Sequence, residues 1–405
     1  MHKLDAPFKF KVLATDKNSS ARRGAIQTGH GEIQTPVFMP VGTSGSVKAM
    51  TFESVWESGA RIILGNTYHL YLRPGHELIK SFGGLHKYQG WDGAILSDSA
   101  GYQVFSLSNL NKVTEDGVAF RSHLDGSKHM FTPELSMEIQ LALGSDIVMA
   151  FDHCLPYGVA ESEAAKAVDR THRWLQRCVK AFGEEGLANE NPWQQVLFGI
   201  VQGGVYENER RRSAAQLVDL NLPGYAVGGL SVGEPTPAMR EMTELTAGLL
   251  PADKPRYLMG VGYPDDIVDS VSRGIDMFDC VLPTRLARKG TVITRDGRLV
   301  VKNSRYQDDS RPIDSECNCP VCKRHSRAYI RHLFHAGEML GPMLASTHNI
   351  CFYQQFMQEI RDSLEAGEFS SYASRVRQRW IDGEKHRLEE IASATPGGRK
   401  SINNP

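Results

Sequence analysis

Short apolar runs recur along the chain, and polar or amphipathic segments separate them. Runs without alternating polar positions are typical of strands that are buried on both faces, as in a parallel sheet. Eight such runs are present, at residues 36–41, 61–65, 94–97, 146–151, 196–201, 225–229, 256–260 and 276–281. The pattern therefore predicts eight parallel strands.

Segments with helical spacing of apolar residues lie between most of these runs, at residues 51–58, 133–143, 162–182, 207–220, 236–250 and 264–273. Thr132-Pro133-Glu134 and Ser162-Glu163 are helix-start signals for two of them. Eight strands that alternate with helices predict a TIM-type (β/α)8 barrel of the α/β class. The alternative is a doubly wound open sheet with an extra domain. The absence of G-x-G-x-x-G after the early runs disfavours it.

The two ends of the chain differ from this pattern. Residues 8–14 and 23–34, around Gly29 and Gly31, resemble antiparallel strands that form a lid over one end of a barrel. Helices are expected at residues 326–340 and 347–364. The predicted organisation has four parts: strands capping the barrel (1–34), the barrel (35–285), a basic hairpin with a C-terminal subdomain and closing helices (286–392), and a flexible tail (393–405).

Polar residues and glycines stand at the ends of six predicted strands: Asp98, Asp152, Gln202-Gly203-Gly204, Gly228-Gly229, Met259-Gly260 and Asp279. An aspartate at a strand end is often only a turn former or helix cap. In a barrel, however, the active site lies at the carboxyl ends of the strands. Several carboxylates in one pocket suggest substitution at an acetal-like carbon, with one acid as nucleophile and another as general acid/base. Asp276 is the alternative nucleophile to Asp279 and should lie on the other face of the strand.

Composition narrows the class of protein. The 405 residues are 41% hydrophobic and 23% charged, which indicates a globular chain with a large core. The start of the chain lacks a signal-peptide pattern, and no apolar stretch is long enough for a membrane span, so we expect a cytoplasmic protein with no membrane partner. The net charge of −1 means that a nucleic acid must bind a local patch. The obvious patch is a run of seven basic residues: Arg285, Arg288, Lys289, Arg295, Arg298, Lys302 and Arg305.

Three of the seven cysteines, Cys317, Cys319 and Cys322, lie within six residues of one another. Clustered thiolates with an imidazole are typical of a tetrahedral zinc site. Spacing alone leaves four candidates for the fourth ligand: His325, His332, His335 and His348. A Cys3His set is closed to substrate, so we expect one structural zinc per subunit, and the subdomain at residues 286–392 is a C-terminal zinc-binding subdomain that follows the catalytic barrel.

Seven motifs, taken in order, resemble the tRNA-guanine transglycosylases, and specifically the bacterial queuine tRNA-ribosyltransferases. They are SDSAGYQVFSL (97–107), FDHCLPY (151–157), GIVQGGVY (199–206), YAVGGLSVGEP (225–235), RYLMGVG (256–262), GIDMFDCVLPTR (274–285), and the cysteine cluster with HNI (348–350). The resemblance implies a zinc-containing (β/α)8 barrel that replaces guanine at position 34 of a tRNA with a GUN anticodon. The sugar-phosphate chain stays intact, and the step belongs to queuosine biosynthesis.

The resemblance also implies roles for individual residues. Asp279 matches the nucleophile that attacks C1′ of the target ribose and forms a covalent ribosyl-enzyme, and Asp98 matches the general acid/base. The residues that match the base-binding groups are Ser99, Tyr102, Asp152, Gln202, the Gly229 amide, the Leu230 carbonyl and Met259. Arg285 and Arg288 match contacts to the anticodon. The zinc ligands would be Cys317, Cys319, Cys322 and His348.

Four positions bear on the base that enters the pocket. Ala100 and His153 stand where the family commonly has Gly and Glu. If position 100 requires a positive φ, alanine costs roughly 1 kcal/mol there. Val232 and Cys154 stand where the enzymes that use queuine tend to have Gly and Val. Val232 would fill the space that the queuine ring needs, so we expect the chain to use preQ1 (7-aminomethyl-7-deazaguanine) or guanine as the free base.

The family commonly forms a homodimer through its zinc region, and His325, Tyr329 and His332 are the candidates for that interface. Three other kinds of protein are alternatives. A non-catalytic paralogue would not need both Asp98 and Asp279, and an ordinary glycoside hydrolase barrel would need neither the basic run nor the Cys3His set. The archaeal relatives carry additional RNA-binding domains after the last helix.

Overall fold

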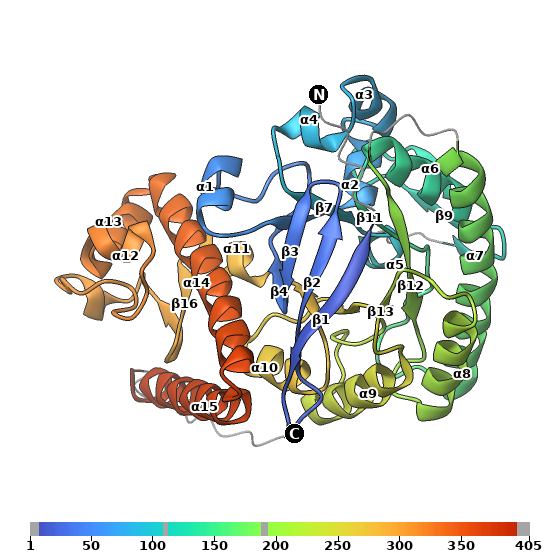
Figure 1. Cartoon of the computed structure of the whole chain (residues 1–405). Coiled ribbons are helices and arrows are strands. Elements are labelled where there is room, and N and C mark those ends of the chain that lie inside the picture. The colour runs from blue at the N-terminus through green and yellow to red at the C-terminus, as the bar shows by residue number, and fades with distance from the viewer. Residues whose placement is uncertain (1–7, 108–111, 188–192, 395–405) are drawn as a thin grey trace, which may run out of the picture.

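A closed parallel barrel forms the centre of the computed structural model, which describes residues 8–107, 112–187 and 193–394 (Figure 1). The strands follow one another around the barrel in the order β4 (Val37–Met39), β15 (Met277–Asp279), β14 (Arg256–Leu258), β13 (Gly224–Val227), β12 (Val196–Val201), β11 (Ile147–Met149), β7 (Ala94–Ser97), β6 (Ile62–Gly65) and β5 (Val41–Gly42). Only Pro40 separates β4 from β5, so the two are segments of one interrupted strand. All eight predicted strands are present, and the open-sheet alternative is wrong.

Helices cover the outside of the barrel. The six predicted helices are confirmed as α1 (Phe52–Glu57), α6 (Pro133–Leu143), α7 (Glu161–Leu187), α8 (Glu207–Val218), α9 (Thr236–Leu249) and α10 (Pro264–Ser272). Thr132 caps α6 by accepting from the Leu135 amide, as its sequence signal indicated. The prediction missed α2 (Thr67–Leu72), α3 (His76–Ser81), α4 (Leu85–Gln89), α5 (Gly101–Leu107) and α11 (Leu282–Ala287). They are too short for a helical period to be recognised.

A second missed element is a small antiparallel sheet between α5 and α6, with strands β8 (Lys112–Val113), β9 (Val118–Arg121) and β10 (Lys128–Phe131). Its turn is tied to α7, because the Glu115 carboxylate accepts from Arg170 at 3.0 Å and from Arg173 at 2.8 Å. The sheet therefore extends the barrel wall on the side of α7.

The N-terminal sheet closes the amino-terminal end of the barrel. It consists of β1 (Lys9–Thr15), β2 (Arg22–Thr28) and β3 (Gly31–Thr35) in antiparallel order. The predicted segment at residues 23–34 is thus two strands joined at the turn of Gly29 and His30. Ile26 and Ile33 pack with the side chains that fill the barrel interior. The packed side chains of the barrel interior therefore separate this sheet from the polar groups at the carboxyl-terminal end of the barrel.

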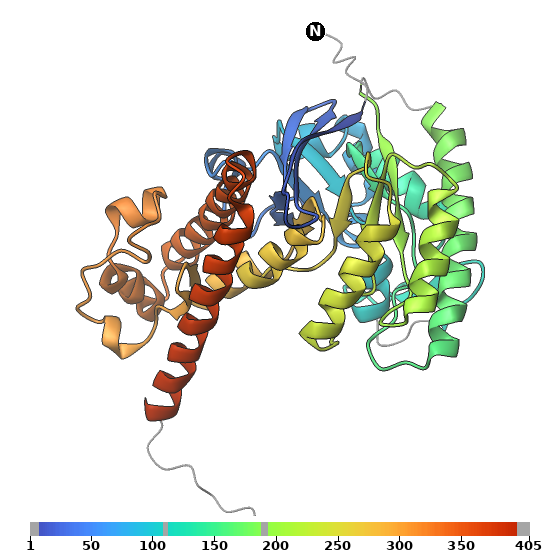
Figure 2. The same cartoon turned by 60° about the horizontal axis from the view of Figure 1, so that its bottom comes forward.

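The C-terminal helices form a layer beside the barrel (Figures 1 and 2). The elements are β16 (Thr291–Thr294), β17 (Gly297–Val300), η1 (Ser304–Tyr306), α12 (Pro320–Arg324), α13 (Arg327–Ala336), α14 (Leu340–Glu365) and α15 (Phe369–Ala394). Helix α15 includes Ser393 and Ala394, which the prediction had assigned to the tail, whereas residues 395–405 lie outside the described residues. The division at residues 34, 285 and 392 stays a prediction. In the described ranges, no helix combines the length and apolar character needed to cross a bilayer.

Candidate active site

The carboxyl ends of the barrel strands meet at a cavity of about 360 Å³. Ten predicted residues line it together: Asp98, Ser99, Tyr102, Asp152, Gln202, Gly229, Leu230, Met259, Asp279 and Arg285. Several strands, β13 and β14 among them, end earlier than predicted, so Gly228-Gly229 and Met259-Gly260 follow β13 and β14 and are free to turn toward the cavity. The predicted residues thus converge at one site, although their roles stay predictions.

Asp98 follows β7 and is buried, with both carboxylate oxygens saturated by donors. Oδ1 accepts from the amides of Thr67 at 2.9 Å and Ala100 at 3.2 Å. Oδ2 accepts from the side chains of Asn66 and Gln103. Burial nevertheless raises the pKa of Asp98 to about 6, and the negative charge of Asp279 adds to the rise. A pKa near neutrality suits a group that both takes and returns a proton.

Asp279 ends β15 and is half-buried at the cavity. Its Oδ1 accepts hydrogen bonds from the Tyr257 hydroxyl at 2.6 Å and from the Gly260 amide at 2.9 Å. Within the described residues no hydrogen bond reaches its Oδ2. Burial raises the pKa of Asp279, and the two hydrogen bonds oppose that rise. One carboxylate oxygen is therefore fixed, and the other is available to a ligand.

Asp276 is excluded as the alternative nucleophile because it lies at the opposite end of the barrel. Its carboxylate receives two hydrogen bonds from the Arg22 guanidinium, at 2.9 and 2.6 Å, and a third from the Arg256 amide at 2.7 Å. Arg22 belongs to β2 of the N-terminal sheet, so the ion pair ties the lid to the barrel. Asp276 and Asp279 therefore lie at opposite ends of the barrel as well as on opposite faces of the strand.

Asp152 is buried between two partners on neighbouring strand ends. Its Oδ1 accepts from the Ser99 hydroxyl at 2.9 Å, and its Oδ2 accepts from the Gln202 amide at 2.6 Å. Burial raises its pKa, and both hydrogen bonds oppose the rise. Glycine is required beside them: Gly229 has φ +63°, and a Cβ there would lie 2.3 Å from the Gln202 amide oxygen. The result is a carboxylate and an amide held side by side, a suitable edge for a purine.

The loop after β13 is shaped by Glu234. Its carboxylate accepts from the amide of Ser231 and, at 2.9 Å, from the amide of Val232. In a trans peptide the carbonyl points opposite to the amide hydrogen. The Leu230 carbonyl therefore points away from Glu234, and its role as an acceptor stays a prediction.

The two departures from the family pattern have different consequences. Ala100 has φ +68°, so the condition for strain at this position is met. His153 does not line the cavity of Asp98 and Asp279; its Nδ1 lies 3.2 Å from Nη1 of Arg170. Burial and the charge of Arg170 lower the pKa of His153 to about 4. A neutral imidazole that faces α7 leaves the charge of Asp152 unchanged.

The basic run divides into paired and unpaired cations. Three arginines form ion pairs with acids of the C-terminal helices: Arg295 with Glu359, Arg298 with Glu384 and Arg305 with Glu390. The phosphate-binding strip stays a prediction, and three of its seven charges are already paired within the protein. Arg285 and Arg288, on and just after α11, have no carboxylate within ion-pair distance in the described ranges. Arg285 lines the cavity and Arg288 does not.

A second group of predicted residues converges away from the cavity, as a metal-binding group. The Cys317, Cys319 and Cys322 sulfurs lie 3.8, 3.5 and 3.3 Å from Nδ1 of His348. His348 Nε2 lies 2.8 Å from the Ile293 carbonyl, which can only accept, so Nε2 carries the proton and the Nδ1 lone pair faces the thiols. The geometry selects His348 from the four histidines that spacing had left open.

Three cavity residues were missed at the sequence level. Asn66 and Gln103 bind Asp98, and Tyr257 binds Asp279. Asn66 directly follows a predicted strand, as Asp98 does, so the same pattern identifies it as a candidate. Tyr257 lies inside an apolar run, where a tyrosine is indistinguishable from core. Cys154 was noted only as a pocket position, and burial raises the pKa of its thiol to about 12.

A (β/α)8 barrel with two aspartates at the carboxyl ends of its strands, one saturated by donors and one with an accessible oxygen, is typical of a barrel enzyme. The chain belongs to the queuine tRNA-ribosyltransferase family, whose model matches residues 16–381. It is therefore an enzyme of a transferase family.

Several curated relatives have the name queuine tRNA-ribosyltransferase. The protein of Pelotomaculum thermopropionicum is 55% identical over 363 residues, which cover 90% of this chain and 96% of the relative. That of Symbiobacterium thermophilum is 52% identical over 390 residues, or 96% of each chain. That of Zymomonas mobilis is 55% identical over 374 residues, which cover 92% of this chain and 96% of the relative.

Proposed function

We propose that this enzyme exchanges guanine at position 34 of tRNAs with a GUN anticodon for preQ1, through a covalent ribosyl-aspartate. The observation that carries the proposal is the pair of aspartates on one cavity: Asp279, with an oxygen that receives no hydrogen bond from the described residues, and Asp98, with a pKa of about 6. Family membership supports the tRNA substrate.

In the proposed reaction, Oδ2 of Asp279 attacks C1′ of the ribose while the C1′–N9 bond breaks and its electron pair leaves on guanine. Asp98 supplies a proton to the departing guanine and later takes the N9 proton of the incoming base. The N9 lone pair then attacks C1′ and releases the Asp279 carboxylate. The fixed position of Oδ1 supports this assignment, because a pre-oriented nucleophile needs little rearrangement to react.

We propose that the base lies with its edge on Asp152, Gln202 and the Gly229 amide, and between Tyr102 and Met259. Tyr102 is 54% exposed although its neighbours Asp98 and Ser99 are buried, which leaves its ring free to cover a ligand. The orientation of the Leu230 carbonyl supports an acceptor for the aminomethyl group of preQ1.

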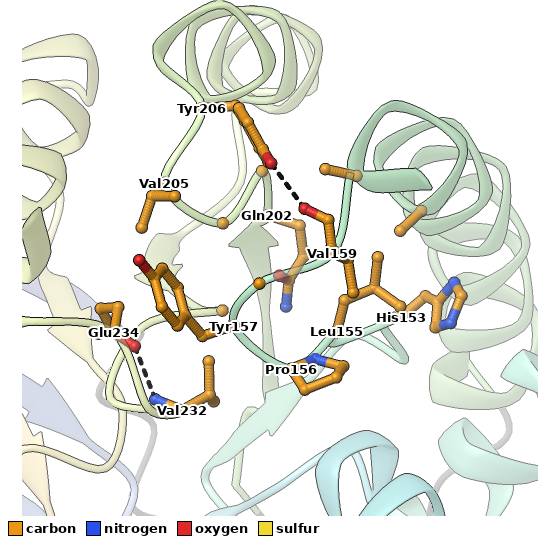
Figure 3. Close-up of a pocket in the computed structure, with 16 residues that line it drawn as sticks. His153, Leu155, Pro156, Tyr157, Val159, Gln202, Val205, Tyr206, Val232 and Glu234 are labelled. Carbon is orange, nitrogen blue, oxygen red and sulfur yellow. Dashed lines mark hydrogen bonds between the residues drawn. The ribbon is translucent and has the colours of Figure 1, made fainter. Parts of the chain in front are cut away.

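The choice of preQ1 over queuine is attributed to Val232. This residue lines both the base cavity and a second hollow, of about 20 Å³, on its other side. Figure 3 shows Val232 beside Tyr157, with its amide bonded to Glu234. Because Glu234 fixes the backbone, the Val232 side chain is held between the two cavities, where the ring of queuine would clash with it.

We propose one structural zinc ion per subunit in the Cys3His group. Tetrahedral zinc with Zn–S of about 2.3 Å and Zn–N of about 2.05 Å places S and N about 3.6 Å apart. The S···N distances of 3.3 to 3.8 Å support this geometry. The imidazole is buried, and all four positions are taken by protein, so no site is left for substrate.

We further propose a homodimer through the surface next to this metal group. His325 stacks on Tyr329 with ring centroids 5.2 Å apart, and several large apolar side chains nearby are exposed: Tyr329, Met339, Leu340 and Met343. Met339 is 81% exposed, which is costly in water and supports burial against a partner.

The decisive experiment incubates the protein with a GUN-anticodon tRNA and labelled guanine. We expect incorporation by the parent protein, a tRNA adduct on denaturing gels, and neither with Asp279→Asn. The matched control is Asp269→Asn, which changes a buried aspartate of α10 outside the cavity. Absence of exchange by the parent protein would end the enzyme proposal, and an adduct that survives Asp279→Asn would remove Asp279 as the nucleophile.

A further inference from the structure

A second large cavity lies where the C-terminal helices pack against the barrel, apart from the candidate active site. It has a volume of about 240 Å³ and is lined by α14, α15, the first residue of α10 and the turn after β16. An apolar cavity of about 150 Å³ is large enough to bind benzene. This cavity therefore has room for a planar molecule of one or two rings. Apart from Arg295 of the basic run, none of the predicted site residues lines it.

Aromatic side chains make up the apolar part of its wall: Phe352, Phe356, Tyr372 and Trp380. Phe352 and Phe356 lie nearly parallel, with an interplanar angle of 15°, one turn apart on α14. Phe352, Phe356 and Trp380 are otherwise buried in the protein core. Rigid aromatic faces of this kind favour a flat ring that stacks against them.

The polar part of the wall combines ion-paired arginines with one further cation. Its three arginines are Arg295, Arg375 and Arg379, and its two acids are Glu316 and Glu359. Arg295 pairs with Glu359 and Asp314, and Arg379 pairs with Glu316 and Asp296. Arg375 has no carboxylate within 4.0 Å among the residues that the structure describes, and its guanidinium lies 6.0 Å above the Tyr372 ring.

Arg295 adds no second free contact. Its Nη1 has no hydrogen-bond partner in the described part of the chain, but it is fully buried, and an Asp314 carboxylate oxygen lies 3.7 Å away. A ligand in the cavity would therefore meet one uncompensated cation, Arg375, beside an aromatic wall.

We propose that this cavity binds a planar aromatic molecule that carries a single anionic group, such as an aryl carboxylate or sulfonate. The ring lies against the aromatic wall of α14 and α15, and the anion faces Arg375. A dianion would exceed the available charge, because the other two arginine charges are already paired. A neutral ring would leave the charge of Arg375 uncompensated.

The test titrates naphthalene-1-sulfonate into the full-length protein by calorimetry, in the presence of saturating guanine so that the base cavity is blocked. We expect one site per chain, and weaker binding of the neutral analogue 1-naphthol. Arg375→Ala should weaken binding of the sulfonate about ten- to hundredfold, because it removes a charge-assisted contact. It should leave binding of 1-naphthol nearly unchanged.

Two variants of α15 complete the experiment. Gln378→Ala changes an exposed residue of the same helix that does not line the cavity, and binding should be unaffected. Val376→Phe adds bulk to the wall and should abolish binding of both probes. The proposal is overturned if the sulfonate does not bind, if guanine competes with it, or if Arg375→Ala and Gln378→Ala bind it equally well.

Discussion

The Tyr257 hydroxyl donates a 2.6 Å hydrogen bond to Oδ1 of Asp279, across the neighbouring strands β14 and β15. Burial and the charge of Asp279 raise the pKa of Tyr257 well above its usual value, so the tyrosine stays protonated and donates. Tyr257 therefore positions the proposed nucleophile without contacting C1′ itself.

Tyr257→Phe should lower kcat about ten- to hundredfold with little change in KM for tRNA, because a hydrogen bond to a charged group contributes about 1.5–3 kcal/mol. The lost bond normally lowers the pKa of Asp279, so the acid limb of the pH–rate profile should move to higher pH. Tyr225→Phe is the control, since this tyrosine is equally buried but its hydroxyl accepts from the Leu222 amide. An unshifted acid limb in Tyr257→Phe would contradict the positioning role.

The raised pKa of Asp98 predicts a pH dependence of stability. The folded pKa of about 6 exceeds the ordinary value of 3.8, so between these values the folded protein binds more protons than the unfolded chain. The free energy of unfolding should therefore fall as pH rises from about 4 to 6, by at most about 3 kcal/mol. Asp98→Asn should flatten this fall in urea unfolding curves, whereas Asp92→Asn, at an exposed position, should not. Identical pH profiles for Asp98→Asn and the parent would show that Asp98 has an ordinary pKa.

Arg285 and Arg288 should contact tRNA because their charges are not paired within the described protein. Arg285→Ala and Arg288→Ala should each raise KM for tRNA and reduce the slope of its dependence on log salt by about one. Affinity for the free base should change little. Arg305→Ala is the matched control from the same basic run, since its charge is paired with Glu390. An equal loss of free-base affinity would instead place Arg285 in the base pocket.

Loss of one metal ligand should release the metal. Cys319→Ser should give protein without bound zinc by elemental analysis and a melting temperature lower by several degrees, because metal binding contributes to folding. Cys351→Ser tests the loss of a thiol from the same core cluster, in which Cys351 is buried but is not one of the four converging ligands. Full thermal stability in the zinc-free variant would argue against a structural metal.

Val232→Gly should allow queuine to enter. Overpacking of a rigid pocket costs about 1–3 kcal/mol, or roughly 5- to 150-fold in affinity. The parent protein should therefore incorporate preQ1 and exclude queuine when both compete with labelled guanine, and the variant should accept both. Val205→Gly, which changes the far wall of the second hollow and leaves Val232 in place, should retain the exclusion. Comparable use of queuine by the parent protein would disprove the proposal that Val232 excludes queuine.

Local sequence determined the architecture and the positions of the cavity residues. Apolar runs and helical spacing have short periods, so eight strands and six helices were readable without tertiary information. Because parallel strands all end at one rim, the polar residues after them, such as Asp98 and Asp279, had to converge. The clustered cysteines marked the metal group for a similar reason, since three ligands lay within one short segment.

Tertiary structure decided which of several equivalent charged residues are ion-paired and which face the cavity. Arg295, Arg298 and Arg305 look identical to Arg285 along the chain, but acids of α14 and α15 pair with them. Asp276 was excluded as a nucleophile by Arg22, which lies 254 positions away. Ion pairs and pKa values depend on groups brought close in space and on the depth of burial, and neither quantity has a period in the sequence.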